Sequence, residues 1–179
     1  MTLVPPDDQV QALRRIVSGA LEALTQKHQA RERGLQLMRE VIRCSALTIR
    51  AIHRNEYDEA RRLLAQAREK LQEAMATLRE HPDVYQAGFL QDAQKEYAEA
   101  CLTLAFITSG PVPGPQELGV ELAPYLNGLA EAASELRRYI LDALRRDAPE
   151  RTEALLDLMD EVYSLLVTVD FPDAVTGGL

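Results

Sequence analysis

Apolar residues recur every three or four positions along most of the chain, which is the spacing of one face of an α-helix. Asp7 and Asp8 follow two prolines, a combination typical of a helix start. From there the helical pattern continues to Ile52, interrupted by a polar stretch at 26–34 that contains Gly34. The spacing therefore predicts either one very long helix or two helices that join near Gly34.

Turn and capping residues divide the middle of the chain into two further helices. We expect Asn55 to cap a second helix, whose apolar stripe ends at Leu78. The sequence HPD at 81–83 then ends this helix and begins a third, which continues with helical spacing to Ile107.

The last third of the chain predicts a loop, two more helices and a tail. The segment SGPVPGPQELG at 109–119 holds three prolines and three glycines, so it predicts a loop. Pro124 suits the first turn of a fourth helix, residues 147–149 separate it from a fifth, and 171–179 form a non-helical tail. Together the elements predict an all-α fold, an antiparallel bundle of long helices in a single domain over 1–179. Helices of this length leave apolar surface exposed in a monomer, so we expect a homo-oligomer.

The amino-acid composition agrees with an all-α fold and also indicates the cellular compartment. The 179 residues are 46% hydrophobic and 27% charged but only 5% aromatic, without tryptophan, so the core must be aliphatic. The two cysteines, Cys44 and Cys101, form neither a disulfide framework nor a zinc pattern. A signal-peptide pattern is absent, and no apolar run approaches the roughly 20 residues of a membrane span. We therefore expect a reduced protein of the cytoplasm that is not inserted in a membrane.

Charge is distributed unevenly, although the net charge of −8 argues at first against nucleic acid as a partner. Residues 1–80 carry a net charge of +3, whereas residues 81–179 carry −11. A basic half and an acidic half suit a protein that holds an anion in one place and a cation in another. Solvated helix faces alone would produce the same imbalance.

Two pairs of glutamates have a spacing that suits a metal site. Glu96 and Glu99 share one face of the predicted third helix, and Glu131 and Glu135 share one face of the fourth, among small residues that allow a close neighbour. If these helices pack antiparallel, the four carboxylates converge, and Mg²⁺ (or Mn²⁺) prefers such oxygen ligands. The same spacing is common on solvated helix faces, so both interpretations stay open. A di-iron centre is less favoured, because neither helix carries Glu-x-x-His.

Arginines at helical spacing form a basic group on the first two helices. They could neutralise the phosphates of a single strand, and they could equally form surface ion pairs with neighbouring glutamates. The candidate nucleic-acid-binding residues are Arg43, Arg50, Arg54, Arg61, Arg62 and Arg68.

Four stretches of the chain resemble the translin family, which includes translin and translin-associated factor X. They are RERGLQLMREVIRCSALTIRAIHR, HPDVYQAGFLQDAQKEYAEA, ELGVELAPYLNGLAEAASELRRYILDALR and DFPDAVTGGL, within residues 31–179. The resemblance implies a seven-helix all-α fold and hollow oligomers, commonly octamers, that enclose nucleic acid.

The factor X branch of this family carries a Mg²⁺-dependent endoribonuclease site with the motifs E-Y-x-E-A and Y-L-x-G-x-A-[DE]-x-x-x-E-L. These motifs fall here on Glu96 and Glu99 and on Glu131 and Glu135, so the resemblance implies a catalytic metal site at these four residues. The chain is most similar to this catalytic branch or to a prokaryotic homologue of it, although Glu131 stands where the branch usually has Asp. Relatives usually continue after DAVTGGL, so we expect the family's last C-terminal helix to be missing after Leu179.

These observations predict a single-stranded RNA-binding protein with Mg²⁺-dependent endoribonuclease activity, in which a carboxylate-bound metal activates water to cleave a phosphodiester. One alternative is a non-catalytic translin-type protein that binds single-stranded RNA or DNA. Another is an all-α nucleoside triphosphate pyrophosphatase. Those enzymes usually carry a denser E-E-x-x-E pattern, which Lys95 and Ala98 do not provide.

Overall fold

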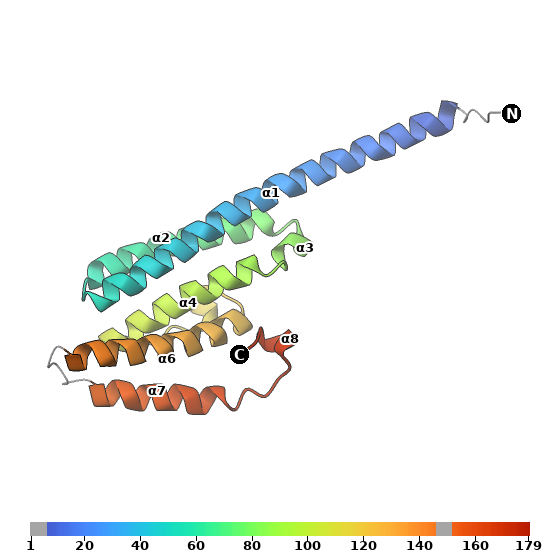
Figure 1. Cartoon of the computed structure of the whole chain (residues 1–179). Helices are drawn as coiled ribbons and strands as arrows, with labels where there is room; N and C mark the ends of the chain where they lie inside the picture. The colour runs from blue at the N-terminus through green and yellow to red at the C-terminus, as the bar shows by residue number, and fades with distance from the viewer. Residues whose placement is uncertain (1–6, 146–151) are drawn as a thin grey trace.

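The computed structural model describes residues 7–145 and 152–179, and within them every regular element is an α-helix. This confirms the all-α prediction. In this part of the chain five long helices form the bundle, and three helices of four residues lie between them or at the end (Figure 1). The long helices are α1 (Asp7–His53), α2 (Tyr57–Leu78), α4 (Phe89–Thr108), α6 (Leu122–Arg145) and α7 (Thr152–Leu166). The short ones are α3 (Pro82–Tyr85), α5 (Pro115–Leu118) and α8 (Asp173–Thr176).

The first helix, α1, continues without a break through the polar stretch at 26–34. Of the two possibilities that the sequence left open, one long helix is therefore correct. Gly34 stays helical and is buried against α2, where a Cβ added to it would meet the Leu78 side chain at 3.0 Å. The glycine therefore allows α1 to pack closely on α2 and does not end a helix. The prolines before Asp7 and residues 147–149, both expected as helix boundaries, lie outside the described residues.

The breaks between helices differ in detail from the prediction. Asn55 does not cap the second helix: its φ of 61° lies in the left-handed region, which asparagine tolerates, so it ends α1 and leaves Glu56 in the N-cap position of α2. Gly88, with φ of 91°, divides the expected third helix into α3 and α4. The expected loop at 109–119 and tail at 171–179 each contain one helical turn, α5 and α8, ended by a glycine at positive φ.

The long helices pack in two antiparallel pairs, α1 with α2 and α6 with α7 (Figure 1). In contrast, α4 and α6 run in the same direction (Figure 1), whereas from the sequence we considered an antiparallel pair. The Gln94 side-chain oxygen accepts a hydrogen bond from the Glu121 backbone N–H at 2.9 Å, and Lys95 contacts Glu131, so the two helices advance together. The reason is the connection through α5, which returns the chain to the level at which α4 begins.

Two aliphatic clusters fill the interior of the bundle. One lies around Ile52, Leu102 and Leu136, and the other lies around Leu37 and Leu90. Burying one such side chain stabilises the fold by about 1.5–3 kcal/mol, so these residues hold α1, α2, α4 and α6 together. Among the described residues, no helix is both long and apolar enough to cross a bilayer.

The N-terminal part of α1 extends beyond the bundle (Figure 1). We call residues 7–26 the N-terminal arm. Its apolar stripe is open to solvent, since the side chains of Leu13, Ile16 and Leu21 are 61–66% exposed. Directly after the arm, Lys27 joins α1 to α3 through an ion pair of 2.8 Å with Asp83.

Candidate metal centre

The centre of the site is a close approach of α4 and α6 at Gly128. A Cβ at this position would lie 2.7 Å from the backbone oxygen of Lys95 and 2.9 Å from both the Ala98 Cβ and the Glu99 backbone nitrogen. Only a residue without a side chain fits such a contact. The glycine therefore brings the two backbones near enough for glutamates on the adjacent turns to meet.

Three of the four predicted glutamates come together at this crossing. Glu96 and Glu99 of α4 and Glu131 of α6 each offer a carboxylate oxygen, and these oxygens all lie within 4.8 Å of one another. All three side chains are half-buried. The pKa of the Glu99 carboxyl is raised to about 8, first by burial and then by the negative charges of the neighbouring glutamates. The cluster is therefore electrostatically strained and favours an added proton or cation.

The fourth predicted glutamate, Glu135, lies outside this cluster. Its Oε2 atom is 2.6 Å from Nε2 of His53, at the C-terminal end of α1, and 3.6 Å from Nη1 of Arg138. The hydrogen bond from His53 lowers the pKa of Glu135. Glu135 still acts on the cluster, since its charge contributes to the raised pKa of Glu99.

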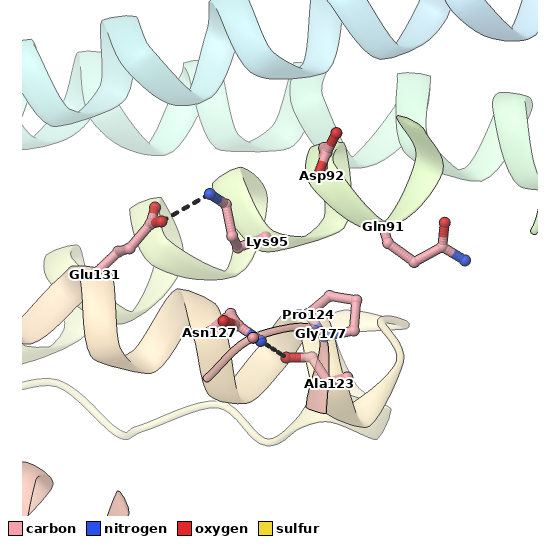
Figure 2. A pocket seen from close by; sticks show the side chains of 9 residues that line it. Gln91, Asp92, Lys95, Ala123, Pro124, Asn127, Glu131 and Gly177 are labelled. Carbon is pink, nitrogen blue, oxygen red and sulfur yellow. Dashed lines mark hydrogen bonds and ion pairs between the residues drawn. The ribbon is translucent and has the colours of Figure 1, made fainter. Parts of the chain in front are cut away.

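Two residues of the site were not among the predicted site residues. His53 is buried, and its contact with Glu135 depends on how the end of α1 packs against α6, which no local pattern reveals. Lys95 places its Nζ atom 2.7 Å from Oε1 of Glu131 and 3.5 Å from Oε1 of Glu96. Figure 2 shows this side chain extending along α4 toward Glu131. Its position directly before Glu96 was the available signal in the sequence.

A polar cavity of about 330 Å³ adjoins the cluster. Its lining comes from α4, the start of α6 and the two glycines after α8 (Figure 2). Asn127 joins α6 to the end of α8, because its Nδ2 atom donates to the Thr176 backbone oxygen at 2.6 Å. The same atom also donates to the Ala123 backbone oxygen of its own helix at 2.9 Å. Lys95 and Glu131 line both the cavity and the cluster, so the two spaces share a wall.

All six predicted arginines are exposed, but their charges are not equally available. Arg54, Arg61 and Arg62 pair with acidic residues within three positions along the chain, at 2.5–2.8 Å. Within the described residues Arg43 and Arg50 form no ion pair. Arg68 donates to the backbone oxygen of Glu117 at 3.3 Å. Three of the six charges are therefore neutralised locally. Arg43 and Arg50 of α1 and Arg68 of α2 have no acidic partner among the described residues.

The chain is similar to known proteins in both sequence and fold. No family model matches the chain. An uncharacterized protein of Methanocaldococcus jannaschii is 31% identical over 150 residues, which are 83% of this chain and 66% of that protein. The chain therefore spans slightly less than two thirds of the length of this relative.

Solved structures of C3PO proteins are similar in fold and, in part, in sequence. The Archaeoglobus protein AfC3PO, in a complex with duplex RNA, superposes with a TM-score of 0.84 at 32% identity, covering 91% of this chain and 84% of that one. AfC3PO without RNA gives a TM-score of 0.83 at the same identity over 91% and 85% of the two chains. Apo-NeC3PO, at 19% identity and a TM-score of 0.70 over 96% and 86% of the two chains, shares the fold. With this identity over most of both chains, the protein belongs to the translin family, the family of the C3PO subunits.

Proposed function

We propose that this protein binds single-stranded RNA and cleaves it as a Mg²⁺-dependent endoribonuclease. The observation that carries the proposal is the cluster of Glu96, Glu99 and Glu131, whose carboxylate oxygens lie within 4.8 Å of one another beside a polar cavity. Perturbed titratable groups that gather next to a cavity are typical of active sites.

The donor set fits a hard divalent ion. Three carboxylates present only oxygen ligands, which Mg²⁺ and Mn²⁺ prefer, and Lys95 already places a positive charge against two of them. Glu96, Glu99 and Glu131 would hold the ion, with Glu135 as a fourth acidic group beside them. A bound divalent ion would activate water and neutralise charge on the scissile phosphate. The chain's own part is to place the carboxylates at the α4–α6 crossing and to hold Glu135 through His53.

The basic face of α1 supports nucleic acid as the ligand. Arg43 and Arg50 are exposed, stand seven residues apart on one helix face and form no ion pair among the described residues. Contacts with phosphates would hold a backbone without reading its sequence, so single-stranded DNA is also expected to bind. The complex of AfC3PO with duplex RNA supports RNA as a ligand in this family. Cytoplasmic RNA would be the substrate.

A homo-oligomer, an octamer in the fullest form of the proposal, would enclose this site. The exposed apolar stripe of the N-terminal arm supports assembly, because monomeric proteins rarely leave such a surface open.

A non-catalytic single-strand binder is the second candidate, and the contact of Lys95 favours it. The ammonium group supplies a cation to the carboxylate cluster without any metal. In this case RNA binding depends on salt and does not require Mg²⁺.

Cleavage of an end-labelled single-stranded RNA, with Mg²⁺ and then with EDTA, tests the proposal. We expect Mg²⁺-dependent cleavage that is lost when Glu96 and Glu131 are both replaced by alanine. Glu69→Ala, which changes an exposed glutamate of α2, is the matched control and should keep full activity. Full activity of the double variant would exclude the metal site, and binding without cleavage would support the second candidate. Turnover of free nucleoside triphosphates would instead indicate a pyrophosphatase.

A further inference from the structure

Among the described residues, Lys95 is the only cation placed against the carboxylate cluster. Its Nζ atom lies 2.7 Å from Oε1 of Glu131 and 3.5 Å from Oε1 of Glu96, so it bridges α6 and α4. In the same part of the chain, Glu96 and Glu131 have no other ion-pair partner. The lysine side chain is 29% exposed, which strengthens its contacts relative to a fully solvated pair.

A divalent ion bound by the same carboxylates would meet this ammonium group at close range. Two cations that share a carboxylate oxygen repel each other, and repulsion is strong where water is partly excluded. A lysine side chain is a flexible four-carbon stem, so it can leave the cluster more easily than the backbone-fixed glutamates can. The adjoining cavity, which Lys95 also lines, gives the released side chain a place to go.

We propose that Lys95 is an internal counter-ion, which stabilises the carboxylate cluster in the metal-free protein and which a divalent ion must displace. The inference rests on the proposed metal site and adds that one residue sets its affinity. It follows that Lys95 has opposite effects on the two states. It favours the metal-free fold and opposes metal binding.

These opposite effects distinguish a counter-ion from a purely structural residue. Replacing a purely structural residue would destabilise the metal-free fold and weaken metal binding together. Lys95→Met keeps an unbranched side chain and removes the charge. The free energy of unfolding in EDTA should then fall, while Mn²⁺ should bind about tenfold more tightly. Of this tenfold increase in Mn²⁺ affinity, roughly fivefold comes from the ion pair that no longer has to be broken, and the loss of repulsion between the two cations adds the rest.

Titration of the full-length protein with Mn²⁺ measures the affinity without any activity assay. The readout is the electron paramagnetic resonance signal of free Mn²⁺, which decreases as the ion binds. Glu131→Gln identifies the site, because it should weaken this binding. Lys70→Met is the matched control, since Lys70 pairs with Glu73 of its own helix, at 3.8 Å, and its replacement should leave the dissociation constant unchanged. Lys95→Arg keeps the charge and should bind Mn²⁺ no more tightly than the wild type.

Each outcome has one meaning. Tighter Mn²⁺ binding by Lys95→Met with a less stable metal-free fold supports the proposal, including the case in which only this variant binds. Equal or weaker binding by Lys95→Met, beside a wild type that binds at the Glu131-dependent site, overturns the role of Lys95 and leaves the metal site standing. Absence of Glu131-dependent binding in both proteins overturns the metal site and the role of Lys95 together.

Discussion

At the scale of single residues, the side chain under most electrostatic strain is Glu99. It is half-buried at the centre of the carboxylate cluster, and its pKa of about 8 means that it keeps its proton at neutral pH in the metal-free protein. In the unfolded chain the same group loses its proton near its ordinary value of 4.5. The folded state therefore binds one proton more than the unfolded state between these two values.

This difference predicts how the stability of the metal-free protein changes with pH. Since the folded state holds the extra proton, the contribution of Glu99 to stability decreases as pH rises from 4.5 to about 8 and then levels off. Glu99→Gln should flatten this part of the profile. Urea unfolding in EDTA at several pH values measures it, and an unchanged slope in the variant would contradict the assignment.

The contact between His53 and Glu135 predicts a second effect at this scale. Removing the imidazole with His53→Ala leaves a partly buried carboxylate without its hydrogen bond and opens a cavity, so we expect a loss of about 2–4 kcal/mol in the free energy of unfolding. His28→Ala, at an exposed position of α1, should change it by less than about 0.5 kcal/mol. Equal effects of the two substitutions, measured by chemical denaturation, would show that the contact is not structural.

At the scale of elements, the site depends on how closely α4 and α6 approach. Gly128→Ala introduces a Cβ that would meet backbone atoms of α4, which cannot rotate away as a side chain can. We expect the helices to separate, with a loss of about 1–3 kcal/mol in stability and weaker Mn²⁺ binding.

Gly19→Ala is the control for this substitution. Gly19 is also helical, but a Cβ there meets nothing within 4 Å, so the substitution should stabilise the protein by up to about 1 kcal/mol. Calorimetry and Mn²⁺ titration of both variants measure the difference. Unchanged stability and affinity in Gly128→Ala would mean that the close approach is not required.

The basic face of α1 predicts an effect on RNA affinity. Arg43→Ala with Arg50→Ala should weaken binding of a single-stranded RNA and lower the slope of log affinity against log salt by about 0.7 for each phosphate that the protein no longer neutralises. Arg61→Ala with Arg62→Ala should have a smaller effect, because acidic partners already neutralise these two charges. Fluorescence anisotropy at several salt concentrations compares the pairs, and the reverse order would move the RNA-binding face to α2.

For the molecule as a whole, the N-terminal arm is notable because it packs against neither aliphatic cluster of its own chain. Substitutions there should therefore leave the bundle folded. Leu13→Glu with Leu21→Glu should reduce the mass found by analytical ultracentrifugation and leave the helical circular dichroism signal unchanged. A mass equal to that of the wild type would mean that the arm does not assemble the oligomer.

The long helices and the spacing of the candidate ligands follow from local sequence alone. Helical periodicity follows from hydrogen bonds between residues four apart. The apolar stripes of the long helices can therefore be recognised from residues that are close in sequence; these helices are α1, α2, α4, α6 and α7. For the same reason Glu96 and Glu99, and Glu131 and Glu135, had to share a helix face. Four stretches within residues 31–179 also indicated the translin family before any packing was known.

Which side chains meet depends instead on how the helices pack. The parallel course of α4 and α6 and the close contact at Gly128 bring Glu96, Glu99 and Glu131 together. The end of α1 packs against α6, so that His53 holds Glu135 outside the cluster. Such contacts join residues tens of positions apart, and they depend on the shape of buried surfaces, which local periodicity does not encode.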